Sequence, residues 1–305
     1  MKLVITGSLG NISKPLAEQL VQQGHTVTVI SSNPDKAQAI KALGAIPAIG
    51  SVEDPAFLAA AFKGADAVYL MEPPGGFFDP NFDIYEHCNR LAHSFAEAVQ
   101  QSGVKRIVHL SSIGAHTGKG NGILAFHYNV EQILNQLPSD VAIAFMRPVG
   151  FYYNLLSFIP VIKSQGAIVS NYGGDDKEPW VAPVDIAAAV AKMITQPFEG
   201  RTVHYVASDE LSPNEVAAVL GKAIGQPNLK WVAIPDEQLL NGMLAMGMNA
   251  GIARGMIEMN ASRRGGRLYE DYFRHRPVLG KTKMTEFAKD FAAAYANQVA
   301  EPVAH

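Results

Sequence analysis

Several residue types and patterns that would point to particular functions are scarce or absent in this sequence. Its 305 residues include one cysteine, Cys88, which excludes an internal disulfide and a thiolate-rich metal site. The nine histidines show neither His-x-x-His nor His-Glu-x-x-His spacing, so we expect no metal. No segment approaches the roughly 18 consecutive apolar residues of a membrane helix. The net charge of -3 gives no reason to expect nucleic acid or a membrane as a partner. We therefore expect a cytoplasmic globular protein.

The first 150 residues alternate short apolar runs with longer amphipathic stretches. The runs are too short for helices and are predicted as strands over 3–6, 26–30, 46–49, 67–71, 106–110 and 141–146. The longer stretches are predicted as helices over 15–23, 34–43, 55–63, 82–102 and 126–136. Strict alternation of this kind predicts an α/β fold, with a doubly wound parallel sheet covered by helices on both faces.

The pattern changes after residue 150. A predicted helix over 184–195 and a strand over 202–206 fit the same sheet, so we assign 181–207 to the first domain together with 1–150. The segments 151–180 and 208–305 are predicted to form a smaller, mainly helical lobe for substrate or ligand, with a final helix over 285–297. The stretch 236–267 carries no strand signal. The methionines between Met243 and Met259 fit either core packing or a pliable pocket.

The stretch TGSLGNISKP, residues 6–15, connects the first predicted strand to the first predicted helix. A turn in this position can present backbone N–H groups and a positive helix end to a pyrophosphate. Gly7 would make the tight turn, and Gly10 would let the phosphates approach. Ser13 takes the place of the usual third glycine, where its hydroxyl can bond to backbone or to phosphate. We expect Gly7, Leu9, Gly10, Asn11 and Ile12 to bind a dinucleotide.

Further segments strengthen this reading, and together they resemble a known family. They are SSNPDKA, GSVEDPAFLAAAFKGADAVYLMEPP, VKRIVHLSSIGA, FHYNVEQIL, RPVGFYYNLL and WVAPVDIAAAVAKMI. In order and spacing they are similar to the NmrA-like group of atypical short-chain dehydrogenases/reductases, over about residues 1–200. The resemblance implies an NAD(P)-binding Rossmann domain with a small substrate lobe. That group includes NADPH-dependent quinone reductases and proteins that bind the nucleotide to sense redox state.

The end of the second predicted strand bears on the choice of dinucleotide. It carries no carboxylate before Asp35, so NAD(H) lacks its usual ribose anchor and NADP(H) is preferred, with NAD(H) left open. The expected contacts are Ser31, Ser32, Asn33 and Lys36. By resemblance, the cofactor groove continues through Gly50, Ser51, Val52, Met71, Glu72, Pro73, Ser111 and Pro148. Glu72 is unusual near a pyrophosphate and is interpreted as pointing to solvent or bonding a ribose hydroxyl.

The usual catalytic pair of a short-chain reductase is absent, because the sequence contains no Tyr-x-x-x-Lys. Where the resemblance places that pair, His127 replaces the tyrosine and Glu131 replaces the lysine. His127, with an ordinary pKa near neutrality, and the adjacent Tyr128 are candidate proton donors. His127 and Glu131 also fit a solvated pair on one helix face. Ser111, or its neighbour Ser112, is a candidate to bond the substrate or to support the cofactor.

Two functions follow from these residues. The first is an NAD(P)H-dependent oxidoreductase that reduces a quinone-like or carbonyl compound without a Tyr-x-x-x-Lys pair. The second is a non-catalytic redox sensor that acts through a protein partner. The expected pocket wall consists of Met71, Tyr128, Phe151, Tyr153 and Trp180. The basic run 263–267 fits either a solvated turn or closure over a phosphate-bearing ligand. The sequence leaves open whether the protein forms a homodimer.

Overall fold

A computed structural model describes residues 1–73 and 75–297 of the chain. Its centre is a seven-stranded sheet in which all neighbouring strands run parallel. In spatial order the strands are β10 (Arg201–Val206), β6 (Ala142–Pro148), β5 (Arg106–Leu110), β4 (Ala67–Leu70), β1 (Lys2–Ile5), β2 (Thr26–Ser31) and β3 (Ile46–Ile49). The predicted doubly wound α/β fold is confirmed. The strand order reverses direction between β1 and β4, where ligands of such sheets bind beyond the carboxyl ends of the strands.

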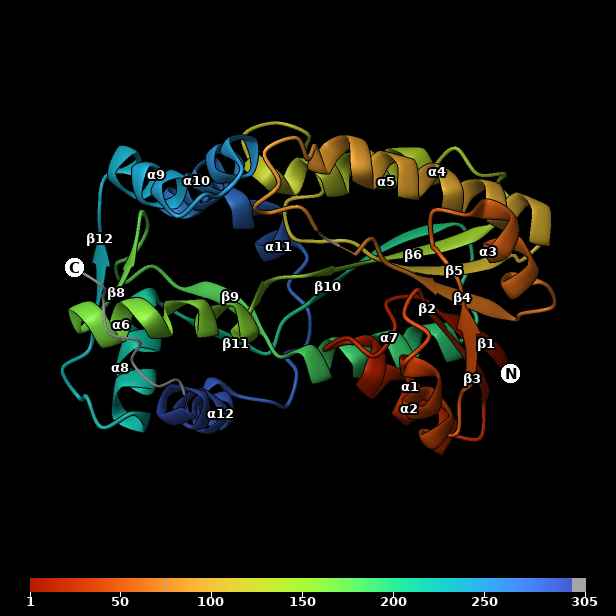
Figure 1. The fold of residues 1–305 in the computed structure, drawn as a ribbon, viewed down its shortest axis with the longest axis horizontal. Coiled ribbons are helices and arrows are strands. Elements are labelled where there is room, and N and C mark those ends of the chain that lie inside the picture. Colours follow the sequence, from red (N-terminus) through yellow and green to blue (C-terminus); the bar gives the residue numbers. More distant parts are fainter. Residues whose placement is uncertain (74, 298–305) are drawn as a thin grey trace.

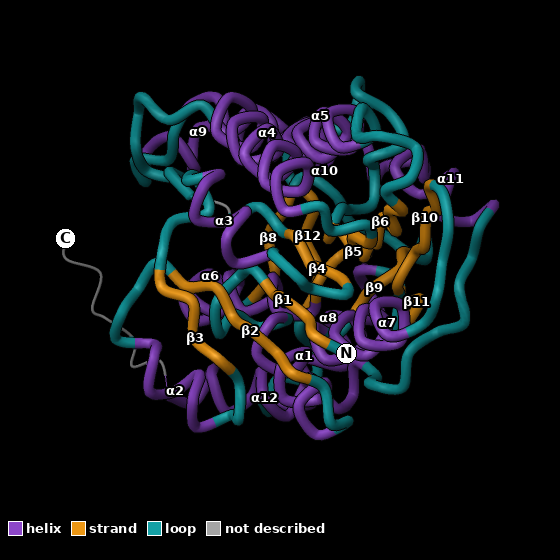
Figure 2. Tube along the Cα trace, turned by 90° about the vertical axis from the view of Figure 1, so that its right-hand side faces the viewer, coloured by secondary structure: helices purple, strands orange, loops and turns teal. Residues whose placement is uncertain are grey.

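Helices cover both faces of this sheet, as Figures 1 and 2 show. One layer contains α3 (Pro55–Phe62), α4 (Ile84–Ser102) and α5 (Ala125–Leu134), and the other contains α1 (Ser13–Gln22), α2 (Lys36–Ala42) and α7 (Pro183–Thr195). Each layer packs its apolar side chains on the sheet, which produces two separate hydrophobic cores. Every residue of β4 and β6 is buried, as expected for central strands covered on both faces.

Local sequence signals fix where several of these helices begin. The Asp54 carboxylate accepts hydrogen bonds from the N–H groups of Ala56 and Phe57 at the start of α3. Asp83 caps α4 in the same way, and Gly103 ends that helix in the left-handed conformation. Asp54 and Asp83 therefore define the first turns of α3 and α4.

The rest of the chain forms a second group of elements beside the main sheet. They are β7 (Gly150–Phe151), η2 (Tyr152–Phe158), α6 (Ile159–Gln165), β8 (Ala167–Ser170), β9 (Glu178–Val181), β11 (Asp209–Leu211), α8 (Pro213–Ala223), β12 (Lys230–Ala233), α9 (Asp236–Ala245), α10 (Ala250–Arg263), η3 (Arg264–Tyr269), α11 (Glu270–Arg274) and α12 (Met284–Asn297). A further 3₁₀ turn, η1 (Gly122–Leu124), precedes α5. The helices predicted over 236–267 are present. The division into two domains at the boundaries expected from the sequence stays our proposal.

The small sheets in this group were missed by the sequence analysis. β11, β9 and β7 form a three-stranded sheet, and β12 pairs with β8. These strands have two to four residues, too few to show an alternating pattern. Within the methionine-rich stretch, Met243 is buried, and Met248 and Met256 pack against it, so these three side chains serve as core.

No helix in the described part of the chain is long and apolar enough to cross a membrane.

Candidate cofactor and active site

The turn between β1 and α1 brings the backbone and a helix end close together. Gly7 has a φ of 86°, in the left-handed region that favours glycine. A Cβ at Gly7 would lie 2.5 Å from the Ser13 Oγ and 3.0 Å from the Met71 Sδ, so no larger residue fits there. The Ser13 hydroxyl donates a hydrogen bond to the Thr6 carbonyl oxygen at 3.0 Å. Of the two roles expected for this hydroxyl, the structure shows the bond to backbone, which ties helix to strand.

The same turn fits a pyrophosphate. The N-cap of α1 is Ile12, which provides no side-chain hydrogen bond to the helix end. The first N–H groups of a helix have no acceptor within the helix, so this end is suited to an anion. Gly10 is exposed beside it, and Leu9 and Asn11 complete the turn. The residues present therefore fit NAD(P)(H) in the position predicted from the sequence.

At the end of β2, some predicted cofactor contacts are used in bonds within the protein and others are free to bind a cofactor. Ser31 is buried, and its Oγ accepts a hydrogen bond from the Ser8 hydroxyl at 2.9 Å. The Ser31 hydroxyl donates to the Asn33 carbonyl oxygen at 3.3 Å, so Ser31 connects two loops. Its hydroxyl is therefore not free to donate to the cofactor, as the predicted contact would require. Ser32 and Lys36 are exposed and remain the groups suited to a 2'-phosphate. The Asn33 Oδ1 accepts from the Asp35 N–H at 2.8 Å.

The loops after β3 and β4 lie along the same carboxyl edge. A Cβ at Gly50 would meet the Phe57 ring at 2.6 Å, so a larger residue there would have to displace that ring, and the Ser51 Oγ accepts from the Glu53 N–H at 3.1 Å. Val52 packs partly against the core. Met71 lies against the Gly7 turn, and Pro73 is exposed. This edge is continuous from the turn to the loop after β4.

Glu72 corrects one sequence-based interpretation. Its side chain is 1% exposed, so it does not point to solvent. Both carboxylate oxygens lie 3.1 Å from the Nε2 of His109, whose ring is fully buried in β5. A buried polar group needs a hydrogen-bond partner, and the β5 histidine supplies it. Glu72 thus joins the loop after β4 to β5.

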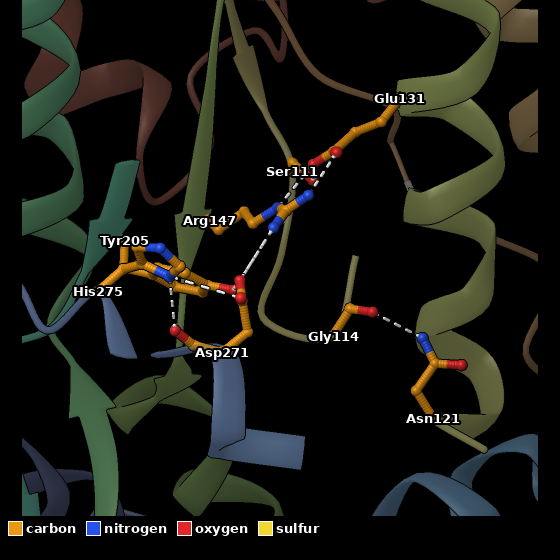
Figure 3. A network of polar contacts seen from close by, with 8 residues as sticks. All are labelled: Ser111, Gly114, Asn121, Glu131, Arg147, Tyr205, Asp271 and His275. Atoms are coloured by element: carbon orange, nitrogen blue, oxygen red, sulfur yellow. Dashed lines mark hydrogen bonds and ion pairs between the residues drawn. The ribbon is translucent and has the colours of Figure 1, made fainter. Parts of the chain in front are cut away.

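Ser111, Glu131 and Arg147 form a buried polar network at the carboxyl edge of β5 and β6, shown in Figure 3. The Ser111 hydroxyl donates to the Glu131 Oε1 at 2.5 Å. The Arg147 guanidinium holds the same carboxylate in a two-pronged pair, with Nε to Oε1 at 2.9 Å and Nη2 to Oε2 at 2.7 Å. Burial opposes the charged form, but the bonds and charge of Glu131 raise the pKa of Arg147, which stays protonated.

The network continues from Arg147 to α11. Arg147 Nη1 lies 3.5 Å from the Asp271 Oδ2, and the Tyr205 hydroxyl donates to that same oxygen at 2.5 Å. His275 lies 3.4 Å from the other Asp271 oxygen. Burial raises the pKa of Asp271, but the bonds and charges of its neighbours, Tyr205 first, lower it below its ordinary value overall. Arg147, Tyr205 and Asp271 had no predicted role. Arg147 could have been found from the sequence, because a charge at the end of an apolar strand needs a buried partner.

This geometry overturns two expectations for α5. Glu131 is buried and pairs with Arg147, so it does not form a solvated pair with His127. The Nδ1 of His127 is buried without a hydrogen-bond partner among the described residues. Burial first, and then the charge of His109, lower the pKa of His127 to about 3. The imidazole is therefore neutral at neutral pH and lacks the pKa that made it a candidate proton donor.

Tyr128 remains available in the same helix. It is half-buried, and its ring packs against Gly118, where a Cβ would come within 2.9 Å of the tyrosine ring. No hydrogen bond of its hydroxyl is found within the described residues. Tyr128 and Glu131 are three residues apart and share one face of α5, the face that carries Glu131 to Ser111.

The other residues predicted to line the pocket differ in how exposed their side chains are. Phe151 is half-buried beside Gly150, and Tyr153 is 50% exposed on η2. Trp180 is 2% exposed in the core of the second group of elements, and its indole N–H donates to the Leu211 carbonyl oxygen. Trp180 is thus a core residue, and its expected place in the pocket wall is wrong. Pro148 is buried at the end of β6 and accepts from the Ile113 N–H at 2.8 Å through its carbonyl oxygen.

The sequence pattern of the NmrA-like family matches residues 1–271. The chain belongs to this family.

Two curated relatives of this NmrA-like protein are reductases. An NAD(P)H azoreductase from Xenophilus azovorans is 28% identical over 296 residues, covering 96% of this chain and 99% of the relative. A (4-alkanoyl-5-oxo-2,5-dihydrofuran-3-yl)methyl phosphate reductase from Streptomyces griseus is 28% identical over 227 residues, covering 74% of each chain. These comparisons support the NAD(P)H-dependent oxidoreductase class expected from the sequence.

A solved structure supports the fold. The NADPH-dependent quinone oxidoreductase of Escherichia coli, solved with NADPH, has a TM-score of 0.76 and 21% identity, covering 94% of this chain and 99% of that one. The named cofactors of the relatives agree with NADP(H) as the cofactor, with NAD(H) also accepted.

Proposed function

We propose that this NmrA-like protein is an NAD(P)H-dependent reductase of quinone, azo or related conjugated acceptors. The observation that supports it most is the placement of two features on one edge of the sheet. The uncapped start of α1 follows β1, and Ser111 follows β5, two strands away through β4. At the usual strand spacing this is about 10 Å. A dinucleotide held by the turn can therefore extend to Ser111.

The residues of the chain hold and orient the cofactor in this proposal. The α1 turn at Gly7 and Gly10 would bind the pyrophosphate, and Ser32 and Lys36 would bind the 2'-phosphate. NADP(H) supplies the hydride when it is bound. The Ser111 hydroxyl donates its hydrogen bond to Glu131, so its oxygen is left to accept a hydrogen bond, for example from a ribose hydroxyl. We therefore assign Ser111 to support of the cofactor and not to donation toward the substrate.

The proton for the acceptor comes from Tyr128 or from water in this proposal. Reduction of a quinone to a hydroquinone adds one hydride and one proton, so it needs no strongly activated acid. Tyr128 is the half-buried hydroxyl on the face of α5 that meets the Ser111 loop. This differs from the Tyr-x-x-x-Lys mechanism, because the carboxylate in the lysine position is paired with Arg147.

The named substrates of the relatives include an azo compound, a quinone and a furanone phosphate. All three contain a conjugated system that can take up hydride. We extend this common chemistry, and no single compound, to the present chain.

The proposal is tested by following NADPH oxidation at the absorbance of reduced nicotinamide against quinones, azo dyes, aldehydes and ketones. We expect turnover with quinones or azo dyes, and a tenfold or larger loss of kcat in Tyr128→Phe, as is typical for removal of a general acid. If Tyr128→Phe keeps full kcat, the proton comes from water. Tight NADPH binding without turnover of any acceptor would reject the reductase and favour the redox sensor.

A further inference from the structure

A small pocket lies beside the network of Ser111, Glu131 and Arg147. It occupies about 110 Å³ between the loop that follows β5 and the turn η3. Its wall includes His116, Thr117, Lys119, Asn121, Arg267 and Leu268. Sites that enclose a whole drug-sized ligand occupy about 300–1,000 Å³, so this pocket has room for one substituent of a larger molecule.

The basic run 263–267 shows why a positive charge reaches this pocket. Arg263 lies 2.5 Å from Glu178, and Arg264 lies 2.6 Å from Asp236, so both are committed to ion pairs. Gly265 and Gly266 follow with φ values of 73° and 77°. Two consecutive residues in the left-handed conformation redirect the chain, and Arg267 then lines the pocket instead of joining the ion pairs.

The negative charges near the pocket are already neutralised. Asp271 accepts from Tyr205 and pairs with Arg147 and His275, while Glu270 lies 3.7 Å from Arg274. Over residues 1–73 and 75–297, the structure shows no ion pair for the side chains of Lys119 or Arg267. Two exposed cations therefore line the pocket without an ion-pair partner among these residues.

Burial lowers the pKa of His116 below its ordinary value, and the charges of Asp271, Arg147, Glu270 and Arg274 modify that effect. His116 is thus neutral at neutral pH, and the positive charge of the pocket comes from Lys119 and Arg267.

The pocket is fixed in place and connected to the active site. The Asn121 side-chain amide donates to the carbonyl oxygens of Gly114 and Thr117 at 2.9 and 2.8 Å, which braces the loop. The Tyr128 ring packs on Gly118, the residue between Thr117 and Lys119. The loop that lines the pocket therefore also contacts Tyr128, and it begins at Ser111.

We propose that this pocket, through Lys119 and Arg267, binds an anionic substituent of the acceptor: a carboxylate, a sulfonate or a phosphate. The inference rests on the proposed reductase function and specifies its substrate class as conjugated acceptors that carry an acidic group. Exposed ion pairs are individually weak, so two cations acting together give about a tenfold preference for the acidic acceptor.

The first test compares an azo dye that bears a carboxylate with the methyl ester of the same dye. We expect the ratio of kcat/KM for the acid to kcat/KM for the ester to be about tenfold lower in Lys119→Met/Arg267→Met than in the wild type, because KM for the acid rises. In the wild type, added salt is expected to lower the same ratio. Lys63→Met is the matched control, because Lys63 is an exposed cation at the end of α3, on the opposite edge of the sheet. An unchanged ratio in the double variant overturns the inference and leaves the reductase function intact.

The second test does not need turnover. Binding of 2-naphthalenesulfonate, which is not reduced, is measured by its fluorescence alongside neutral 2-naphthalenemethanol, with NADP⁺ affinity determined in parallel. We expect the double variant to lose about tenfold in affinity for the sulfonate and nothing for NADP⁺. Equal binding of the sulfonate by wild type and variant contradicts the inference even if no acceptor is ever reduced. Weaker NADP⁺ binding in the variant also overturns it, because the two cations would then serve the cofactor.

Discussion

Single residues decide which dinucleotide fits the end of β2. Ser32 and Lys36 are both exposed, whereas Ser31 is buried and its hydroxyl donates a hydrogen bond to the Asn33 carbonyl oxygen. A carboxylate in the place of Ser32 would repel a 2'-phosphate and could bond the ribose hydroxyls of NAD(H). The choice of cofactor therefore depends on one exposed position.

Ser32→Asp is expected to raise the Kd for NADPH tenfold or more and to leave the Kd for NADH equal or lower. Isothermal titration with both nucleotides measures this change. Asn81→Asp adds the same charge at an exposed position after β4 and serves as the control. A parallel loss of both nucleotides in Ser32→Asp would show damage to the fold and not a change of preference.

The imidazole of His127 is expected to make the stability of the fold depend on pH below neutrality. Its folded-state pKa of about 3 lies below the ordinary value of 6.5, so the unfolded chain binds a proton that the folded chain does not. Stability from this group is complete above pH 6.5 and is lost as the pH falls toward 3. The glutamine of His127→Gln does not titrate. Between pH 7 and pH 4.5, the free energy of unfolding of this variant is therefore expected to fall by about 2 kcal/mol less than that of the wild type.

Urea unfolding at the two pH values measures that difference. His93→Gln replaces an exposed histidine on α4 and is the control. Equal losses in wild type and His127→Gln would mean that His127 titrates in the folded state as it does in the unfolded chain.

At the scale of elements, the Glu131–Arg147 pair joins α5 to β6. Both side chains are less than 10% exposed, and the carboxylate is held at two points. Removing one partner leaves a buried charge, which costs about 3–5 kcal/mol, whereas removing both can be nearly neutral. The two side chains are thus expected to depend on each other more than the pair adds to stability.

Arg147→Met is therefore expected to lower the free energy of unfolding by about 3–5 kcal/mol, and Glu131→Gln/Arg147→Met by much less. Chemical denaturation of the single and double variants forms the test. Arg90→Met, which breaks an exposed i, i+4 pair with Glu86, is expected to change stability by less than about 0.5 kcal/mol. Equal losses in the single and double variants would show that the two side chains do not depend on each other.

The sequence could predict elements whose signals are local. The turn at Gly7 and Gly10 and the central strands were recoverable because each depends on neighbouring residues. The pairing of Glu131 with Arg147, or of Glu72 with His109, joins residues 16 and 37 positions apart and appears only once the sheet has formed. The short strands β8 and β12 depend equally on partners distant in the chain. The sequence also placed a neutral, buried His127 in the position of an acid, because burial cannot be read from residue type.

In the whole molecule, Asp185 fastens the C-terminal segment to the main sheet. Its Oδ2 accepts from the Ser208 hydroxyl at 2.6 Å and from the Thr282 N–H at 3.0 Å, and its Oδ1 accepts from the Thr282 hydroxyl at 3.2 Å. Asp185 lies in the first turn of α7, while Thr282 precedes α12. One carboxylate therefore connects the layer of α7 to the last helix.

Asp185→Ala is expected to leave Thr282 without its acceptor and to speed tryptic cleavage after Lys281 and Lys283 severalfold, with a stability loss of about 1–3 kcal/mol. Limited proteolysis followed by mass spectrometry locates the cuts. Asp176→Ala, at an exposed position in the loop before β9, is the control. Cleavage at unchanged rates would show that other contacts hold the segment.

The position of β10 has a consequence for how the chain is made. β6 ends at Pro148, but its outer neighbour β10 spans Arg201–Val206, with six aligned residue pairs from Ile143 to Pro148. During synthesis on a ribosome, the outer edge of β6 has no partner strand until more than fifty further residues have been added, and this edge is apolar. Unpaired strand edges of this kind attract other chains. The nascent protein is thus open to misassembly at this edge after β6 has emerged and before β10 arrives, and a chain cut short in that interval would keep the exposed edge permanently.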